Sequence, residues 1–254
     1  MTIFRFHIGR AVNKDERTAF KGSKYIQSHM NNTIKSVISD LKDNKKVLFS
    51  GTACQVAGVN SVAKENTNNL YTCDLICHGV PSERVFKDYL KYIEEKYNKK
   101  IKEFIFRDKS FGWHSHIETI IFEDGTKISL EYFKRLFYRH NILRLSCYEC
   151  NYANTHRPAD ITIADFWGVD ELFPEFDDDK GVSLVIINSE KGKKLFNKVK
   201  DRLEVINVSI DDCIKYTYTL NQPTPISETR NEFWEEYERK SFEEMLKKYA
   251  SEDA

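Results

Sequence analysis

Short apolar runs alternate with amphipathic stretches over the first hundred residues. Lys46–Ser50 and Leu70–Ile76 are apolar runs bounded by polar residues, which is typical of buried strands. Each is followed by a turn and then by apolar residues at helical spacing, over Val56–Lys64 and Glu83–Asn98. Strand, turn and helix in this order form the repeating unit of a parallel sheet. The pattern therefore predicts an α/β fold, with ligands bound where the strands end.

A different pattern begins after residue 100. Two strand-like runs flank Asp124 and Gly125, a pair typical of a tight hairpin turn. We therefore expect an antiparallel hairpin insertion near 101–130, within a single α/β domain that spans 1–254 and contains a mixed sheet. The strands predicted for the insertion are Ile101–Phe106, Ile117–Phe122 and Lys127–Leu130.

The rest of the chain is predicted to add helices and further strands. Ser28 is the expected cap of a helix near Asn31–Leu41, and a charged amphipathic helix is expected near 228–249. The other predicted helices are Glu131–His140, Ser189–Arg202 and Ile210–Tyr218, and the other predicted strands are Gly181–Asn188 and Leu203–Val208.

Composition narrows the class of protein. The 254 residues contain 39 basic and 39 acidic side chains, and this balance argues against a general nucleic-acid binder. No apolar run is long enough to span a membrane, and Met1–Arg10 lacks the apolar core of a signal peptide. We therefore expect a cytoplasmic protein. In a reducing compartment the six cysteines favour metal binding or redox chemistry over disulfides.

Four of the cysteines occur in turns. Cys147 and Cys150 form a C-x-x-C pair, a spacing that lets two thiolates reach one metal. Cys54 and Cys77 each follow a predicted strand, so they occupy equivalent places in two β-α units. We hypothesise that these four cysteines meet around one metal centre in a cysteine-rich loop region.

The identity of the metal is left open by the spacing. Four thiolates suit a structural zinc ion and an iron–sulfur cluster alike, although ligands scattered over strand ends favour a redox cluster. Cys73 lies inside a predicted strand and Cys213 inside a predicted helix, so both are expected to be packing residues.

Two further features are candidates for ligand contacts. The polar loop Gly22–Ser28 could hold a phosphate or a ring carbonyl, although its spacing favours a helix cap. His78 follows Cys77 and could protonate a substrate or bond a flavin ring, with a structural hydrogen bond as the equal alternative.

Six motifs then occur in a recognisable order. Together they resemble the coenzyme F420 hydrogenase/dehydrogenase beta-subunit family, whose members are flavin- and iron–sulfur-containing oxidoreductases. The resemblance runs from about Lys21 to Asn188. The motifs are Gly22–Ser28, Gly51–Gln55, Cys77–Pro81, Arg107–Lys109 with Gly112 and Trp113, Ser146–Cys150, and Asp160–Gly168.

The resemblance implies a cofactor set and its ligands. It implies electron transfer between a [4Fe–4S] cluster, FAD and a two-electron acceptor or donor, with a redox partner protein or a small electron carrier. His78 would be the catalytic residue nearest the flavin ring. The implied cluster ligands are Cys54, Cys77, Cys147 and Cys150, and the implied flavin contacts are Ser23, Lys24, Tyr25, Gly51, Thr52 and Gln55.

Members of the family normally carry a further N-terminal stretch, with a Ser-Ser-Gly-Gly segment that helps to hold the flavin. This sequence begins after that stretch, so we expect FAD to bind weakly. The alternative function is a non-catalytic partner-binding protein stabilised by zinc or a cluster, or a fragment with an incomplete flavin site.

Overall fold

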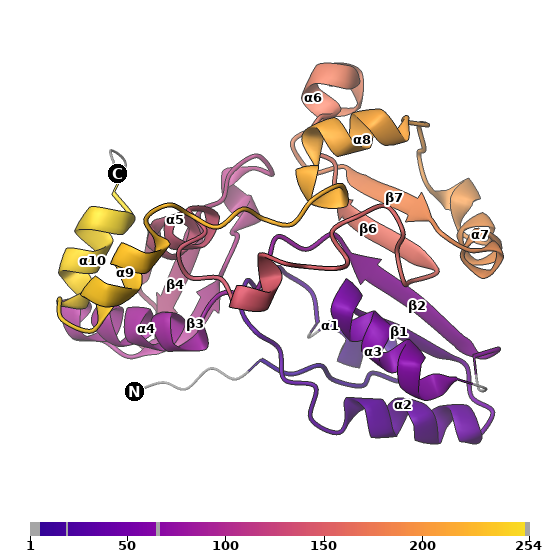
Figure 1. Cartoon of the computed structure of the whole chain (residues 1–254), viewed down its shortest axis with the longest axis horizontal. Coiled ribbons are helices and arrows are strands. Elements are labelled where there is room, and N and C mark those ends of the chain that lie inside the picture. The colour runs from indigo at the N-terminus through magenta and orange to yellow at the C-terminus, as the bar shows by residue number, and fades with distance from the viewer. Residues whose placement is uncertain (1–5, 19, 65–66, 252–254) are drawn as a thin grey trace. The chain divides into compact units, whose positions relative to one another are not determined.

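The structure, a computed structural model, describes residues 6–18, 20–64 and 67–251. These residues group into two compact units that are both discontinuous in sequence (Figure 1). The first unit comprises Met1–His29, Gly79–Tyr148 and Thr224–Ala254, and the second comprises Met30–His78 and Glu149–Pro223.

The second unit is built on a mixed four-stranded sheet. Its strand order is β1-β2-β6-β7, in which β1, β2 and β6 run parallel and β7 runs antiparallel to β6. Thr52 at the end of β1 pairs with Leu75 at the end of β2, so both strands finish at the same edge. The strands are β1 (Val47–Thr52), β2 (Leu70–Leu75), β6 (Ile161–Asp165) and β7 (Ser183–Ile187).

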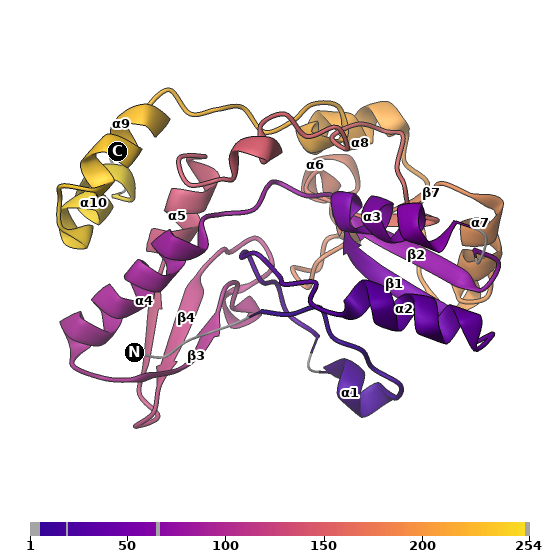
Figure 2. The ribbon, with the colours of Figure 1, turned by 60° about the horizontal axis from the view of Figure 1, so that its bottom comes forward.

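One helix of this unit connects the first two strands. α3 (Ala53–Ala63) lies over β1 and β2 (Figure 2). Its residues Val56 and Val59 are fully buried, so the apolar face of the helix forms the core together with Phe49 of β1. The other helices are α2 (Thr33–Lys42), α6 (Val169–Leu172), α7 (Glu190–Asn197) and α8 (Ile210–Tyr216), with 3-10 turns at Pro174–Phe176, Lys200–Arg202 and Tyr218–Leu220.

The first unit contains a three-stranded antiparallel sheet of order β3-β4-β5. α4 (Glu83–Tyr97) begins where the hydroxyl of Ser82 accepts the amide of Val85, as expected for an N-cap. The strands are β3 (Ile101–Ile105), β4 (Glu118–Phe122) and β5 (Lys127–Leu130). The other helices are α1 (Lys14–Thr18), α5 (Tyr132–Tyr138), α9 (Arg230–Tyr237) and α10 (Phe242–Tyr249), with 3-10 turns at Lys109–Phe111 and Leu145–Cys147.

The core of the first unit is largely aromatic. Phe86 of α4 stacks on Phe106 at 5.3 Å between ring centroids and meets Phe133 of α5 edge-on at 4.9 Å. Phe104 of β3 packs edge-on against Phe106 at 4.7 Å. Offset and edge-to-face pairs of this kind add stability beyond the burial of area. They hold α4 and α5 against the antiparallel sheet.

The predicted α/β class, mixed sheet and antiparallel hairpin are confirmed. The hairpin insertion and the helices near 228–249 both fall in the first unit. The prediction of a single domain over 1–254 stays a prediction, and so does the cysteine-rich metal loop. None of the helices in the described residues is long and apolar enough to cross a bilayer.

Three local predictions were wrong. Leu203–Val208 forms no strand, and its apolar residues Leu203 and Ile206 stay exposed. The expected helix near 228–249 is two helices, because Ser241 starts α10 with a capping box to Glu244. α2 begins after Asn32 rather than at a cap formed by Ser28.

Glu118 is a buried carboxyl group in the core of the first unit. It lies on β4 and accepts hydrogen bonds from the Tyr89 hydroxyl and from the amides of Phe133 and Lys134 at 3.3 and 3.2 Å. These amides belong to the first turn of α5, so the carboxyl group caps that helix from a neighbouring strand. Burial raises the pKa of Glu118 to about 7, although these hydrogen bonds act in the opposite direction.

The raised pKa predicts a pH-dependent stability. The folded state binds the Glu118 proton more tightly than the unfolded state, so the free energy of unfolding should fall as pH rises from about 4.5 to about 7. Each unit of pKa shift corresponds to about 1.4 kcal/mol. Glu118→Gln should remove this part of the pH dependence in urea unfolding experiments. Glu103→Gln, on the exposed side of β3, is the control and should leave the wild-type slope unchanged.

Candidate functional site

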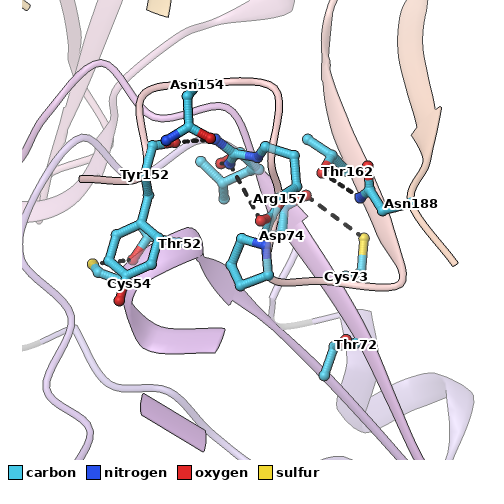
Figure 3. A network of polar contacts seen from close by, with 12 residues as sticks. Thr52, Cys54, Thr72, Cys73, Asp74, Tyr152, Asn154, Arg157, Thr162 and Asn188 are labelled. Carbon is cyan, nitrogen blue, oxygen red and sulfur yellow. Dashed lines mark hydrogen bonds and ion pairs between the residues drawn. The ribbon is translucent and has the colours of Figure 1, made fainter. Parts of the chain in front are cut away.

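Cys54 lies in the first turn of α3, whereas the sequence pattern predicted it in the turn before the helix. The side chain of Gln55 accepts the Thr52 amide at 3.0 Å, which completes a capping box at the helix start. A Cβ on Gly51 would lie 2.8 Å from the Gln55 side-chain oxygen, so a larger residue there would displace the capping side chain. Cys54 is exposed and its sulfur is 3.1 Å from the Thr52 hydroxyl (Figure 3).

Cys77 and His78 follow the end of β2. Pairing with β6 continues to Ile76, whose amide donates to Ile163 at 3.0 Å, and Cys77 is the next residue. Cys77 is half-buried. The ring of His78 meets the ring of Tyr218 edge-on at 5.7 Å, with the Tyr218 hydroxyl 3.3 Å from Nδ1. His78 therefore has the structural hydrogen-bond partner that the sequence left open, and that partner comes from the 3-10 turn after α8.

The C-x-x-C pair spans the point where the chain passes from the first unit to the second. Cys147 ends the 3-10 turn Leu145–Cys147 of the first unit, and Cys150 belongs to the second unit. Both thiols are half-buried. Tyr148 between them is buried and donates its hydroxyl hydrogen bond to the carbonyl of His140. The backbone on the Cys147 side of the pair is therefore anchored in the first unit.

Gly79 lies beside Cys147 within the first unit. With φ at +126°, a Cβ on Gly79 would stand 2.9 Å from Leu143 and 3.5 Å from the Cβ of Cys147. Glycine is therefore required both by the backbone conformation and by the close approach. Cys77 precedes Gly79 by two residues, so the chain alone keeps their Cα atoms within about 7.6 Å.

None of the six cysteines, all of which lie in the described residues, forms a disulfide. In the part of the chain that the structure describes, no three His, Cys, Asp or Glu side chains are grouped closely enough to hold a metal ion. The chemistry of the donor set nevertheless fits a cluster, because four accessible or half-buried thiols are the ligands that iron–sulfur clusters use. The common site for Cys54, Cys77, Cys147 and Cys150 stays a prediction.

Comparison with known families identifies the chain. The family model for the C-terminal part of the beta subunit of coenzyme F420 hydrogenase/dehydrogenase matches residues 44–212, well over half of the chain. The chain belongs to this family. The resemblance inferred from the sequence motifs is thereby confirmed, and the match includes all four cysteines expected to bind the cluster.

A solved structure resembles this beta-subunit family member in fold. It is a chain from the F420-reducing [NiFe] hydrogenase complex of Methanosarcina barkeri, with a TM-score of 0.52 and 15% sequence identity. The alignment covers 89% of this chain and 72% of that chain. At this identity the likeness shows the fold alone. No match to a curated protein was found.

The first aspartate of the motif Asp160–Gly168 has a structural role in this beta-subunit family member. One carboxylate oxygen of Asp160 accepts the amide and the hydroxyl of Thr72 on β2 at 2.9 and 3.2 Å. The other oxygen accepts the hydroxyl of Ser189, at 2.6 Å, and Ser189 is the N-cap of α7. Asp160 therefore joins β2, the start of β6 and the start of α7.

The residues predicted to contact the flavin are divided between the units. Ser23, Lys24 and Tyr25 lie in the first unit, whereas Gly51, Thr52 and Gln55 lie in the second. Tyr25 stacks on Phe137 at 5.4 Å, so its ring also packs the core of the first unit. Lys24 donates to the carbonyls of Lys21 and Gly22 at 2.7 and 3.1 Å, and burial lowers its pKa. The flavin contacts themselves stay predictions.

The second unit also contains a buried ion pair that the sequence did not predict. The guanidinium of Arg157 lies 3.3 Å from the carboxylate of Asp74 on β2, and both side chains are almost completely buried (Figure 3). Burial raises the pKa of Asp74, and Thr162 and Arg157 act in the opposite direction. No local spacing signals this pair, because its partners are far apart in sequence.

Loss of the Asp160 carboxylate should destabilise the protein. Asp160→Ala removes the acceptor of the buried Thr72 amide and hydroxyl and of the half-buried Ser189 hydroxyl, so we expect the free energy of unfolding in urea to fall by about 3 kcal/mol. Asp178→Ala is the control, because Asp178 is exposed and bonds Lys180 beside it, and it should change stability by less than about 0.5 kcal/mol. Equal stability of the two variants would contradict the structural role of Asp160.

Proposed function

We propose that this chain is an iron–sulfur flavoprotein oxidoreductase, or the electron-transfer part of one. The observation that supports the proposal most strongly is the family match over residues 44–212, which contains every expected cluster ligand. Cys54, Cys77, Cys147 and Cys150 would hold a [4Fe–4S] cluster. Such a cluster supplies one-electron transfer at a potential set by its surroundings.

The surroundings of Cys54 and Cys77 support a ligand site at one edge of the sheet. Cys54 sits at the start of α3, where the helix dipole stabilises negative charge, and the Thr52 hydroxyl lies beside its sulfur. β1 and β2 finish together, and Cys54 and Cys77 both follow that edge of the sheet. The ends of parallel strands are the usual ligand-binding edge of such a sheet.

FAD is the second cofactor in the proposal. Backbone amides at the start of α3, with Gly51, Thr52 and Gln55, would face its phosphates, since helix starts bind anions. Ser23, Lys24 and Tyr25 would add contacts from the loop Gly22–Ser28. Tyr218 orients the ring of His78, which would hold or donate a proton beside the flavin.

A redox partner completes the proposed activity. The structural neighbour comes from a hydrogenase complex, which supports a protein partner for this chain as well. A two-electron carrier such as a deazaflavin coenzyme is the proposed small-molecule alternative. The family and the structural neighbour support both proposals.

Anaerobic purification followed by metal, sulfide and flavin analysis tests the whole proposal. A cluster gives a brown protein with a broad absorption band at about 400 nm from thiolate-to-iron charge transfer. A structural zinc site, the rival explanation of the four cysteines, gives a colourless protein. Stoichiometric zinc without iron would therefore reject the redox proposal and favour the partner-binding alternative.

The cluster ligands are tested one at a time. Cys54→Ser, Cys77→Ser, Cys147→Ser and Cys150→Ser should each lower the iron content, because serine is a poor substitute for a thiolate ligand. Cys73→Ser and Cys213→Ser are the matched controls, because Cys73 lies inside β2 and Cys213 is buried in α8. Full iron content in both the Cys147 and the Cys150 variants would reject the ligand assignment.

FAD binding is tested by titrating the iron-loaded protein with FAD and measuring the quenching of flavin fluorescence. We expect FAD to bind more tightly than FMN, since the amides at the start of α3 should contact the dinucleotide phosphates. Equal affinity for the two flavins would show that the second phosphate and the adenosine of FAD make no net contribution to binding. Absence of quenching at a large excess of FAD would contradict the proposal that this chain binds a flavin.

A further inference from the structure

Arg157 forms bonds that tie one turn of the second unit to the end of β2. One guanidinium nitrogen donates to the carbonyl of Tyr152 at 2.5 Å, and another donates to the carbonyl of Leu75 at 3.2 Å. The second nitrogen also lies 3.3 Å from the carboxylate of Asp74. Arg157 therefore connects two segments of backbone and neutralises a carboxylate at the same time (Figure 3).

Both segments are close in sequence to expected cluster ligands. Tyr152 lies two residues after Cys150, within a turn closed by the amide of Ala153 donating to the Cys150 carbonyl at 3.2 Å. Leu75 lies two residues before Cys77 at the end of β2. The guanidinium thus joins the backbone that carries one thiol to the backbone that carries the other.

The turn has further support on either side of Arg157. The side chain of Asn154 donates to the Asn151 carbonyl at 2.7 Å and accepts the His156 amide at 2.8 Å. The carbonyl of Pro158 accepts the side-chain amide of Asn60 on α3 at 2.8 Å. The segment after Cys150 is therefore fixed to itself, to β2 and to α3.

We propose that Arg157 is a positioning residue for the metal centre, because its guanidinium fixes the turn that begins at Cys150 against the end of β2, two residues before Cys77. The inference rests on the proposed cluster ligation. In this role Arg157 acts through the backbone, as the partners behind metal ligands commonly do.

The ion pair alone does not account for an arginine at this place. A buried ion pair can often be replaced by apolar residues of similar volume without loss of stability. An apolar pair would lack the N–H groups that reach Tyr152 and Leu75. Stability and positioning can therefore be separated by substitution.

The test compares Arg157→Met with the double variant Asp74→Leu/Arg157→Met. Arg157→Met alone leaves the Asp74 carboxylate buried without its cation, so it should lower the melting temperature. The double variant should recover stability. It should still bind several-fold less iron than the wild type after anaerobic reconstitution, because the two backbone bonds are missing.

Thiol labelling of the apo protein gives a readout that does not depend on the cluster. A thiol reagent should modify Cys150 about tenfold faster in the double variant than in the wild type, since two hydrogen bonds that hold its turn are lost. The rate is measured by mass analysis of the labelled peptides. Labelling of Cys54 on α3 should not change. Arg84→Met is the matched control, because Arg84 forms an exposed pair with Glu238 in the first unit.

Each outcome decides the proposal. Wild-type iron content and wild-type Cys150 labelling in a stable double variant would show that the pair only stabilises the fold. If the double variant does not fold, Arg157→Lys decides, because lysine lacks the fork in which two separate nitrogens reach the two carbonyls, and wild-type labelling there would reject the proposal. If the wild-type chain itself binds no iron, the proposed function fails, whereas the labelling of Cys150 still tests the positioning.

Discussion

The sheet of the second unit depends on one carboxylate. Asp160 accepts hydrogen bonds from β2 through Thr72 and from the cap of α7 through Ser189, and its amide donates back to Thr72. These bonds fix β6 beside β2 before the strand itself begins. Lys191 lies 3.5 Å from the same carboxylate and partly balances its charge. Because β2 is the inner strand between β1 and β6, its alignment sets where all three parallel strands finish.

The positions of Cys54 and Cys77 follow from that alignment. β1 and β2 end opposite each other, so Cys54 and Cys77 follow the same edge of the sheet. The capping box of Thr52 and Gln55 then fixes where α3 begins and which turn of it carries Cys54. This edge of the sheet therefore carries two cysteines and the start of a helix.

Much of the fold could be predicted because its signals are local. α4 has an apolar face and a serine cap within its own sequence, and the hairpin of β4 and β5 has its turn residues between the strands. Leu203–Val208 looked equally strand-like, but a strand also needs a neighbour, and nothing local supplies one. The Asp74–Arg157 pair and the contact of Tyr218 with His78 could not be predicted either, because their partners are far apart in sequence.

The discontinuity of the two units has a consequence for folding and for dissection of the protein. The chain passes between the units four times, at residues 29/30, 78/79, 148/149 and 223/224. Each unit must therefore close long loops of chain before its contacts form, which is entropically costly and slow. Neither unit can be expressed as one continuous fragment. A cut between the units would separate stretches of chain that belong to the same unit. Limited proteolysis should therefore give fragments that stay associated, not two independent domains.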